Sequence, residues 1–153
     1  MKKILFASIL TSLAACGGGS GSEAVTLAPG FTAPNMLEGR AGGLTDASSL
    51  GDGCIGRIGS DPDHNVTLSA AIPNLRVFAQ AGEDITLVIQ QPDGSYICDD
   101  DTEGLNPLVT QENWAAGDYK IWVGSYNTED GGAAYKLGFS EDGTAMPSML
   151  GSN

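Results

Sequence analysis

The sequence is poor in basic residues. Its 153 residues include 7 Lys and Arg against 19 Asp and Glu, which gives a formal net charge of -12 at neutral pH. Proteins that bind nucleic acid carry basic patches, so this balance argues against a nucleic-acid partner. An acidic surface of this kind keeps an exported protein soluble and favours cations over anions as ligands.

Histidine is scarcer still, because His64 is the only one. It lies in "SDPDHN", between Asp61 and Asp63, but no serine occupies a nucleophile turn between a strand and a helix. A Cys-x-x-Cys spacing is also missing, which argues against zinc. The sequence therefore predicts a protein that is not an enzyme, with no catalytic residue and no bound organic cofactor, and a solvent-exposed His64.

Long hydrophobic runs are missing as well. The apolar run Ile4–Leu13 is too short for a bilayer-spanning helix, which takes about 20 residues. It follows Lys2 and Lys3 and leads into small residues, as in the signal peptide of an exported protein.

The end of this leader, "LAAC", resembles the bacterial lipobox. The resemblance predicts a lipoprotein signal peptide over residues 1–15 and a mature protein that begins at an acylated Cys16. Diacylglyceryl and palmitate chains there would anchor the protein, at about 0.8 kcal/mol for each buried methylene. The alternative is an ordinary cleaved signal with an unmodified cysteine. Gly17 stands where an aspartate favours the inner membrane, so we expect an outer-membrane lipoprotein that faces the periplasm or the cell surface.

The composition divides the rest of the chain. Residues 16–50 open with "GGGSGS" and stay rich in small residues and proline, which predicts a flexible linker. Residues 51–141 carry alternating patterns and form the predicted domain. The tail, residues 142–153 with the sequence "DGTAMPSMLGSN", is predicted to be disordered.

Alternation with period two dominates the predicted domain. Short apolar-alternating segments are separated by turn residues such as the Asp-Gly pair of "QPDG". They are "NVTLSA" (65–70), "NLRVFAQ" (74–80), "DITLVIQ" (84–90), "SYIC" (95–98), "DYKIWVGSY" (118–126) and "AYKLGFS" (134–140). This spacing predicts an all-β fold, an antiparallel, jelly-roll-like β-sandwich of seven or eight strands.

Several large side chains fall on the strand faces opposite the predicted core: Arg76, Phe78, Val88 and Trp122. A sandwich has one outer face per sheet, so these residues either line a binding surface or pack beneath the linker or the tail.

Two segments are similar to a known domain. "AAGDYKIWVGSY" followed by "AAYKLGFS" resembles the last hairpin of the bacterial pre-peptidase C-terminal domain, and "GEDITLVIQQPDGSYICDDD" resembles its central hairpin. The resemblance covers residues 54–140. It implies a jelly-roll-like sandwich of the kind appended to exported peptidases, some members of which bind calcium or extracellular polymers. No peptidase domain accompanies the module here, so the resemblance implies no protease activity.

Two cysteines remain in the domain once Cys16 is assigned to the lipid. Cys54 and Cys98 form an even pair in an oxidising compartment, which predicts a disulfide bond. Two free thiols, or metal ligation by both, are the alternatives.

The segment "CDDDTEGLNP" is the candidate cation site. Calcium takes six to eight oxygen ligands, and Asp99, Asp100, Asp101 and Asn106 offer carboxylate and amide oxygens around a turn at Gly104. The segment is not an EF-hand, because Thr110 stands where the bidentate glutamate belongs. A calcium site and a solvated acidic turn are both open at this stage.

The sequence favours a membrane-anchored lipoprotein that displays a non-catalytic binding module for an extracellular polymer, a protein or a cation. The alternative is a structural or accessory envelope lipoprotein that partners an exported hydrolase. In both cases Cys16 supplies the contact with the membrane.

Overall fold

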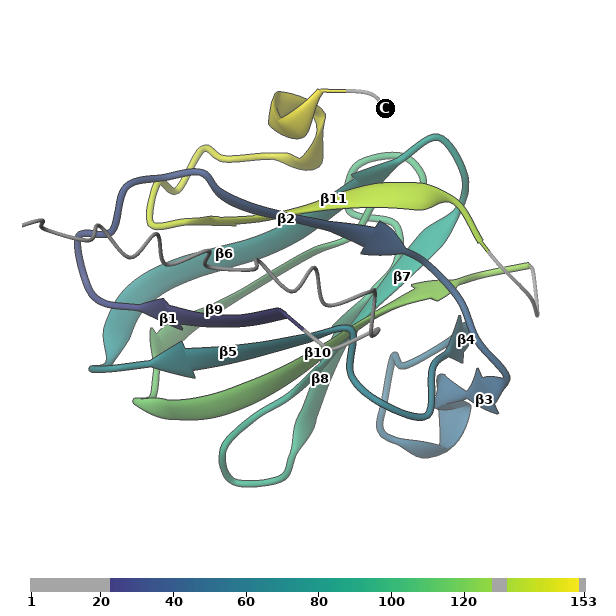
Figure 1. Cartoon of the computed structure of the whole chain (residues 1–153), viewed down its shortest axis with the longest axis horizontal. Coiled ribbons are helices and arrows are strands. Elements are labelled where there is room, and N and C mark those ends of the chain that lie inside the picture. The colour runs from purple at the N-terminus through teal and green to yellow at the C-terminus, as the bar shows by residue number, and fades with distance from the viewer. Residues whose placement is uncertain (1–22, 128–131, 152–153) are drawn as a thin grey trace, which may run out of the picture.

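The computed structural model describes residues 23–127 and 132–151, and these form two β-sheets packed face to face (Figure 1). The predicted signal peptide and Cys16 lie outside the described residues. The larger sheet contains β1 (Glu23–Leu27), β3 (Thr45–Asp46), β4 (Arg57–Ile58), β5 (His64–Leu68), β7 (Ile85–Gln90), β8 (Tyr96–Asp99) and β10 (Gly117–Ser125). The smaller contains β2 (Asn35–Arg40), β6 (Ile72–Ala81), β9 (Leu108–Trp114) and β11 (Ala134–Ser140). Two short 3-10 helices, η1 (Ala47–Ser49) and η2 (Pro147–Leu150), complete the elements.

The long strand β10 organises the larger sheet. It pairs with β5 on one side and with β7 on the other, and β8 continues the sheet beyond β7. The smaller sheet has the order β2-β11-β6-β9. Its pairs are antiparallel, as are those of the larger sheet except the parallel pair β1–β5. The predicted antiparallel β-sandwich is therefore confirmed, with more strands than the seven or eight expected.

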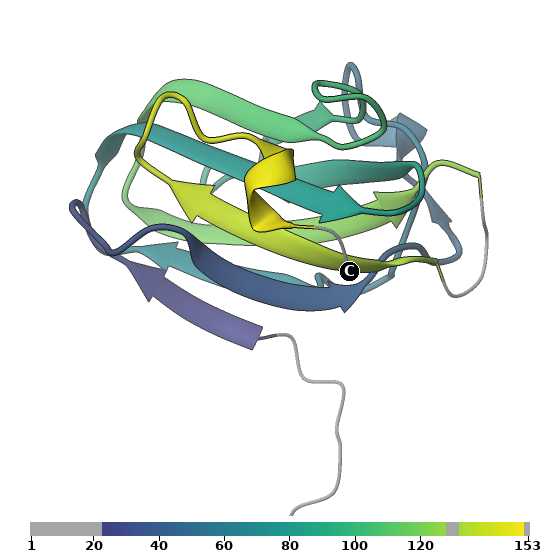
Figure 2. The same ribbon diagram turned by 90° about the horizontal axis from the view of Figure 1, so that it is seen from above.

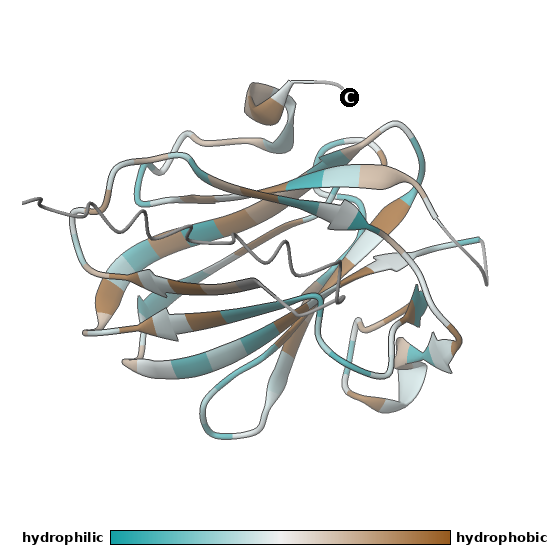
Figure 3. Cartoon of the chain, viewed as in Figure 1, coloured by the Kyte–Doolittle hydropathy of each residue, from teal (hydrophilic) through white to brown (hydrophobic). Residues whose placement is uncertain are grey.

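The main core fills the space between the sheets. Alternate residues of each strand point inward, as the period-two pattern requires, and Leu68, Leu87, Ile89, Ile121 and Phe139 are among the buried side chains. The strands that carry them appear as alternating brown and pale bands (Figure 3). Burial of this apolar surface is the main force that holds the two sheets together.

Both sheets are also covered on part of their outer face. Residues 47–56 lie over the larger sheet and, together with Ile58 of β4, bury Val88 and Trp122. The segment that ends in η2 crosses the smaller sheet over β6 and β11 and buries Phe78 and Leu108 (Figure 2). Of the two alternatives for the outward-facing large side chains, packing beneath flanking segments is therefore the one found. The covering segments are residues 47–56 and the tail.

The limits of the domain differ from those predicted. Residues 23–50 were expected in a linker, but the structure places β1, β2 and β3 there, so the sandwich begins at Glu23. The tail, expected to be disordered from residue 142, folds back onto the smaller sheet, with Ala145 and Leu150 buried. Both segments consist mainly of small residues, so their few buried apolar residues did not form a pattern that predicts a strand or a packed tail. Within the described ranges, no helix is long and apolar enough to cross a membrane.

Candidate binding groove between two sheet edges

A groove of about 340 Å³ lies where the edge of the larger sheet faces the edge of the smaller one. β8 forms one wall and β9 the other. Its polar lining residues are Asp52, Tyr96, Asp99, Thr110 and Gln111, and its apolar ones include Ile97, Leu108 and Val109. The groove therefore combines a phenol ring, an amide, a hydroxyl and carboxylates above an apolar floor, the mixture found in many ligand sites.

The wall formed by β8 is a free sheet edge, because β8 pairs with β7 alone. Gln91 N–H donates to the Ser95 carbonyl at 2.8 Å. In an antiparallel pair, every second residue of a strand directs its main-chain groups to the partner strand, and the residues between direct theirs away from it. By that alternation, the main-chain groups of Tyr96 and Cys98 point away from β7.

The wall formed by β9 is free in the same way, because β9 pairs with β6 alone. Ala79 N–H donates to the Pro107 carbonyl at 3.1 Å, so the same alternation directs the main-chain groups of Leu108, Thr110 and Glu112 away from β6. Leu108 N–H accordingly reaches across the groove and donates to Asp99 Oδ2 at 2.8 Å. This bond joins the two edges at one end of the groove.

The acidic segment predicted as a cation site closes that end. Asp99 bonds to Leu108 as described, and the side-chain oxygen of Asn106 accepts from Ala81 N–H at 2.9 Å. Two of the four predicted ligands are thus hydrogen-bonded to main-chain amides, which fixes the loop against the smaller sheet. No group of three or more His, Cys, Asp and Glu side chains in the described ranges is arranged to hold a metal. Calcium at this loop stays a prediction.

Asp100 and Asp101, the other two aspartates of the segment, act on Asp84 through their charges. Burial, and after it the charges of Asp101 and Asp100, raise the pKa of Asp84. Burial and the charges of Asp101 and Asp99 likewise raise the pKa of Asp100. Asp84 Oδ1 is buried without a hydrogen-bond partner. Mutual repulsion therefore acts on this corner of the molecule, and any cation nearby relieves it.

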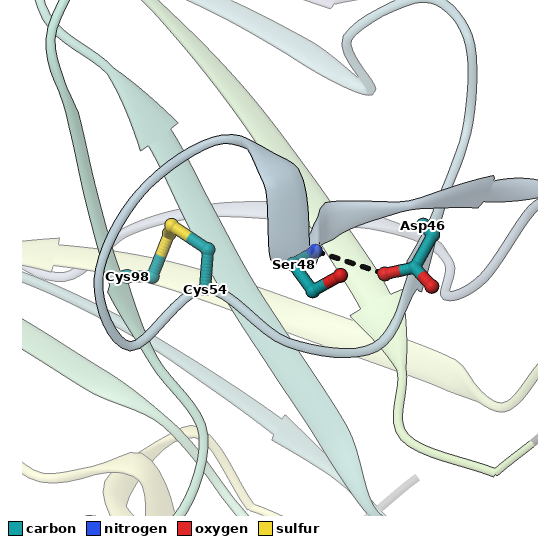
Figure 4. Close-up of a disulfide and its surroundings, with 4 residues drawn as sticks. All are labelled: Asp46, Ser48, Cys54 and Cys98. Carbon is teal, nitrogen blue, oxygen red and sulfur yellow. Dashed lines mark hydrogen bonds between the residues drawn. A yellow bond between two sulfur atoms is a disulfide. The ribbon is translucent and has the colours of Figure 1, made fainter.

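The predicted disulfide between Cys54 and Cys98 is confirmed, with the two Cα atoms 5.0 Å apart (Figure 4). It ties β8 to the segment that covers the larger sheet and holds Asp52 at the rim of the groove. The same segment is shaped by Asp46, whose carboxylate accepts from Ser48 N–H at 2.9 Å at the start of η1 (Figure 4). One wall of the groove is therefore covalently braced.

His64 is buried, with 2% of its surface exposed, so the expectation of a solvent-exposed histidine is wrong. It begins β5, and its position in the strand turns the ring into the space between the sheets. Its Nε2 lies 2.7 Å from the Tyr135 hydroxyl. Burial lowers the pKa of His64 to about 4. The ring is part of the core rather than of an accessible site.

The sequence predicted Asp99 and Cys98 at this corner but missed Asp52, Tyr96, Thr110 and Gln111. β9 was not predicted, because "LVTQENW" alternates too weakly for a strand. The one available signal was the run "CDDD" at a strand end, which marked the corner without indicating the groove beside it.

The geometry defines an all-β sandwich with an open groove between two sheet edges. No protein-family model matches the chain, and no curated protein does. Among solved structures, the chain is similar to the pre-peptidase C-terminal domain of collagenase from Bacillus anthracis. The identity is 17% and the TM-score 0.45, with coverage of 80% of this chain and 100% of that one. It is also similar to Aeromonas hydrophila PliG, a periplasmic inhibitor of g-type lysozyme, at 15% identity and TM-score 0.42, with coverage of 77% and 96%.

Proposed function

We propose that this protein is a bacterial envelope lipoprotein whose β-sandwich is a non-catalytic binding domain, with the groove between β8 and β9 as its ligand site. The observation that carries the proposal is the groove itself. Its walls are two free strand edges, one braced by the Cys54–Cys98 disulfide. A rigid scaffold that presents unpaired main-chain groups and mixed side chains is suited to binding.

The side chains of the groove support binding rather than turnover. Gln111 donates to Gln91 at 2.9 Å and Asp99 accepts from Leu108, so both are oriented by neighbours. Tyr96 is half-buried and its hydroxyl accepts from Gln90 at 3.0 Å, which leaves part of the ring to contact a ligand. These groups recognise a ligand through hydrogen bonds and ring contact, and none of them is a base activated for chemistry.

Anchoring at Cys16 is the second part of the proposal. It rests on "LAAC" after a basic and apolar leader, and residues 17–22 supply the spacer between the lipid and β1. A domain held at the outer membrane in this way encounters envelope polymers, exported proteins and cations.

The binding test compares the wild type with a Tyr96→Ala, Gln111→Ala double variant and with Tyr126→Ala. Tyr126 is 48% exposed and lies outside the groove, which makes it a matched control. The probes are peptidoglycan fragments, lipopolysaccharide, acidic and neutral polysaccharides and a peptide library. We expect at least one probe to bind the wild type and the control but not the groove variant. If the groove variant binds every probe as the wild type does, the groove is not the site.

The anchoring test follows the protein in cells. The wild type should partition with membranes and show a diacylated N-terminal Cys16 by mass spectrometry, whereas Cys16→Ser should not be acylated. An unmodified Cys16 in membrane-free wild-type protein would refute this part.

A further inference from the structure

We propose that the groove takes an extended peptide segment bearing lysine or arginine, which adds to the smaller sheet as a fifth strand beside β9. This inference rests on the proposed function and names the ligand class of the same site. It makes the partner a protein chain rather than a glycan or a free cation.

The free edge of β9 supplies the pairing groups. The main-chain groups of Thr110 and Glu112 point away from β6, and both residues are exposed. An incoming strand can pair with these groups as one strand of a sheet pairs with the next, which is a recurring mode of peptide recognition. The edge ends at Asn113, whose positive φ of 57° breaks the regular ladder. Because the Leu108 N–H is already bonded to Asp99, the usable edge is Thr110–Glu112.

The groove gives an added strand room for its side chains. Successive side chains of a strand point to opposite faces, so every second side chain of the peptide would enter the space between β9 and β8. That space measures about 340 Å³ and has Ile97 and Val109 on its floor. Short apolar or β-branched side chains suit these inward positions.

The charge around the groove selects the outward side chains. Asp52 and Asp99 line it, Glu112 is exposed on β9, and Asp100 and Asp101 follow at its end. Every Lys and Arg in the described ranges lies on another strand, namely Arg40 on β2, Arg57 on β4, Arg76 on β6, Lys120 on β10 and Lys136 on β11. Arg76 lies directly opposite Thr110 in the neighbouring strand, but its guanidinium donates to the Ala145 carbonyl of the covering tail at 2.6 Å. The acidic groups around the groove outnumber this one cation, so a basic peptide is favoured over an acidic one.

The opposite edge of the same sheet offers a matched control. β2 pairs with β11 alone, and Ala41 N–H donates to the Ala133 carbonyl at 3.0 Å, so the main-chain groups of Glu38 point away from β11. Glu38 is exposed, and it is followed on the same edge by Arg40, so this edge carries both signs of charge. Proline at Thr110 or at Glu38 removes an outward N–H without removing a bond inside the sheet.

The experiment measures binding of an acetylated, amidated octapeptide that alternates valine or threonine with lysine. We expect it to bind the wild type and Glu38→Pro alike and to bind Thr110→Pro about tenfold more weakly, the loss expected for about 1.4 kcal/mol. A peptide with N-methyl groups on the pairing amides should not bind. Equal binding to wild type and Thr110→Pro, or to the N-methylated peptide, would overturn strand addition.

A charge reversal covers the case in which Thr110→Pro fails to fold. Asp52 is exposed, so Asp52→Lys should fold, weaken binding of the lysine peptide and improve binding of the same peptide with glutamate in place of lysine. If Asp52→Lys prefers the lysine peptide over the glutamate peptide as strongly as the wild type does, the proposal that the ligand is basic is wrong. If neither peptide binds the wild type, but a glycan binds it and not the Tyr96→Ala, Gln111→Ala variant, strand addition is wrong and the proposed function is supported. If every probe binds that variant and the wild type equally, both strand addition and the proposed groove site are wrong.

Discussion

His64 and Tyr135 meet between the two sheets, at the start of β5 and of β11, with Nε2 of His64 placed 2.7 Å from the hydroxyl of Tyr135. The pair joins the two sheets through a polar contact inside an apolar core. Gly39 lies directly opposite Tyr135 in the neighbouring strand, where a Cβ would collide with the phenol ring. The tyrosine therefore occupies a space that glycine leaves open.

Replacement of Tyr135 by phenylalanine should be costly. His64 Nδ1 is already without a hydrogen-bond partner, so Tyr135→Phe leaves both ring nitrogens unpaired in the core. We expect a loss of about 1–3 kcal/mol in the free energy of unfolding, measured with urea. Tyr119→Phe is the control. It also removes a bonded hydroxyl, which donates to the Ala115 carbonyl at 2.8 Å, but it leaves no buried histidine nitrogen without a partner. An equal or smaller loss for Tyr135→Phe would contradict the interpretation.

The pH dependence of stability should reveal Asp63 and His64 as opposing groups. Burial lowers the pKa of His64 from 6.5 to about 4, so its contribution to stability is lost as the pH falls from 6.5 to 4. Burial raises the pKa of Asp63 from 3.8 to about 6, so its contribution is gained as the pH falls from 6 to 3.8. The two effects oppose each other in the wild type.

Asp63→Asn separates them, because an amide oxygen can still accept from Val123 N–H while the charge is gone. Relative to wild type, the variant should lose about 1–3 kcal/mol more between pH 6.5 and pH 4. Urea unfolding at half-unit intervals of pH measures the difference. Parallel profiles for the two proteins would show that Asp63 titrates normally.

The sequence predicted the strands that carry strong alternation. β6, β7, β10 and β11 were all predicted, since each combines inward apolar residues with flanking turns. β1 and β2 were missed because glycine and proline around them mask a small number of apolar positions such as Leu27 and Leu37.

Local sequence patterns could not predict the groove. It exists because β8 and β9, on different sheets, end up as neighbouring edges, and pairing between sheets is set by long-range packing. The burial of His64 has the same origin, since an isolated histidine between a turn and a strand does not specify which side of the strand faces the core.

Loss of the disulfide should destabilise the protein strongly. The bridge joins residues 44 apart in the sequence, and closing a loop of that size restricts the unfolded chain by about 4 kcal/mol. The Cys54→Ala, Cys98→Ala variant should unfold at lower urea than the oxidised wild type, and the reduced wild type should behave in the same way. A reductant that leaves the wild-type midpoint unchanged would argue against the bridge in solution.

Leu150, close to the end of the described chain, should behave as a core residue. It is 6% exposed and packs with Phe78 and Leu108, and the segment is held by Ser148, which donates to the Glu103 carboxylate at 2.8 and 2.9 Å. Leu150→Ala should cost about 2–3 kcal/mol. Its neighbour Met149 is 63% exposed, so Met149→Ala should change little. Equal effects would mean that the tail does not cover the smaller sheet in solution.

Asp99→Ala decides between the two interpretations of the acidic segment. In the structure Asp99 acts through its bond to Leu108 N–H, which needs no metal, and removing it leaves that half-buried amide unpaired beside the groove. We therefore expect a loss of about 1–2 kcal/mol that is the same in EDTA and in millimolar calcium. Asp101→Asn serves as the comparison: it removes a charge that raises the pKa of Asp84 and Asp100, so it should raise the melting temperature in EDTA, and less at high salt. A calcium site predicts the reverse pattern. In that case calcium would raise the wild-type melting temperature saturably, sodium chloride at equal ionic strength would not, and both variants would abolish the rise.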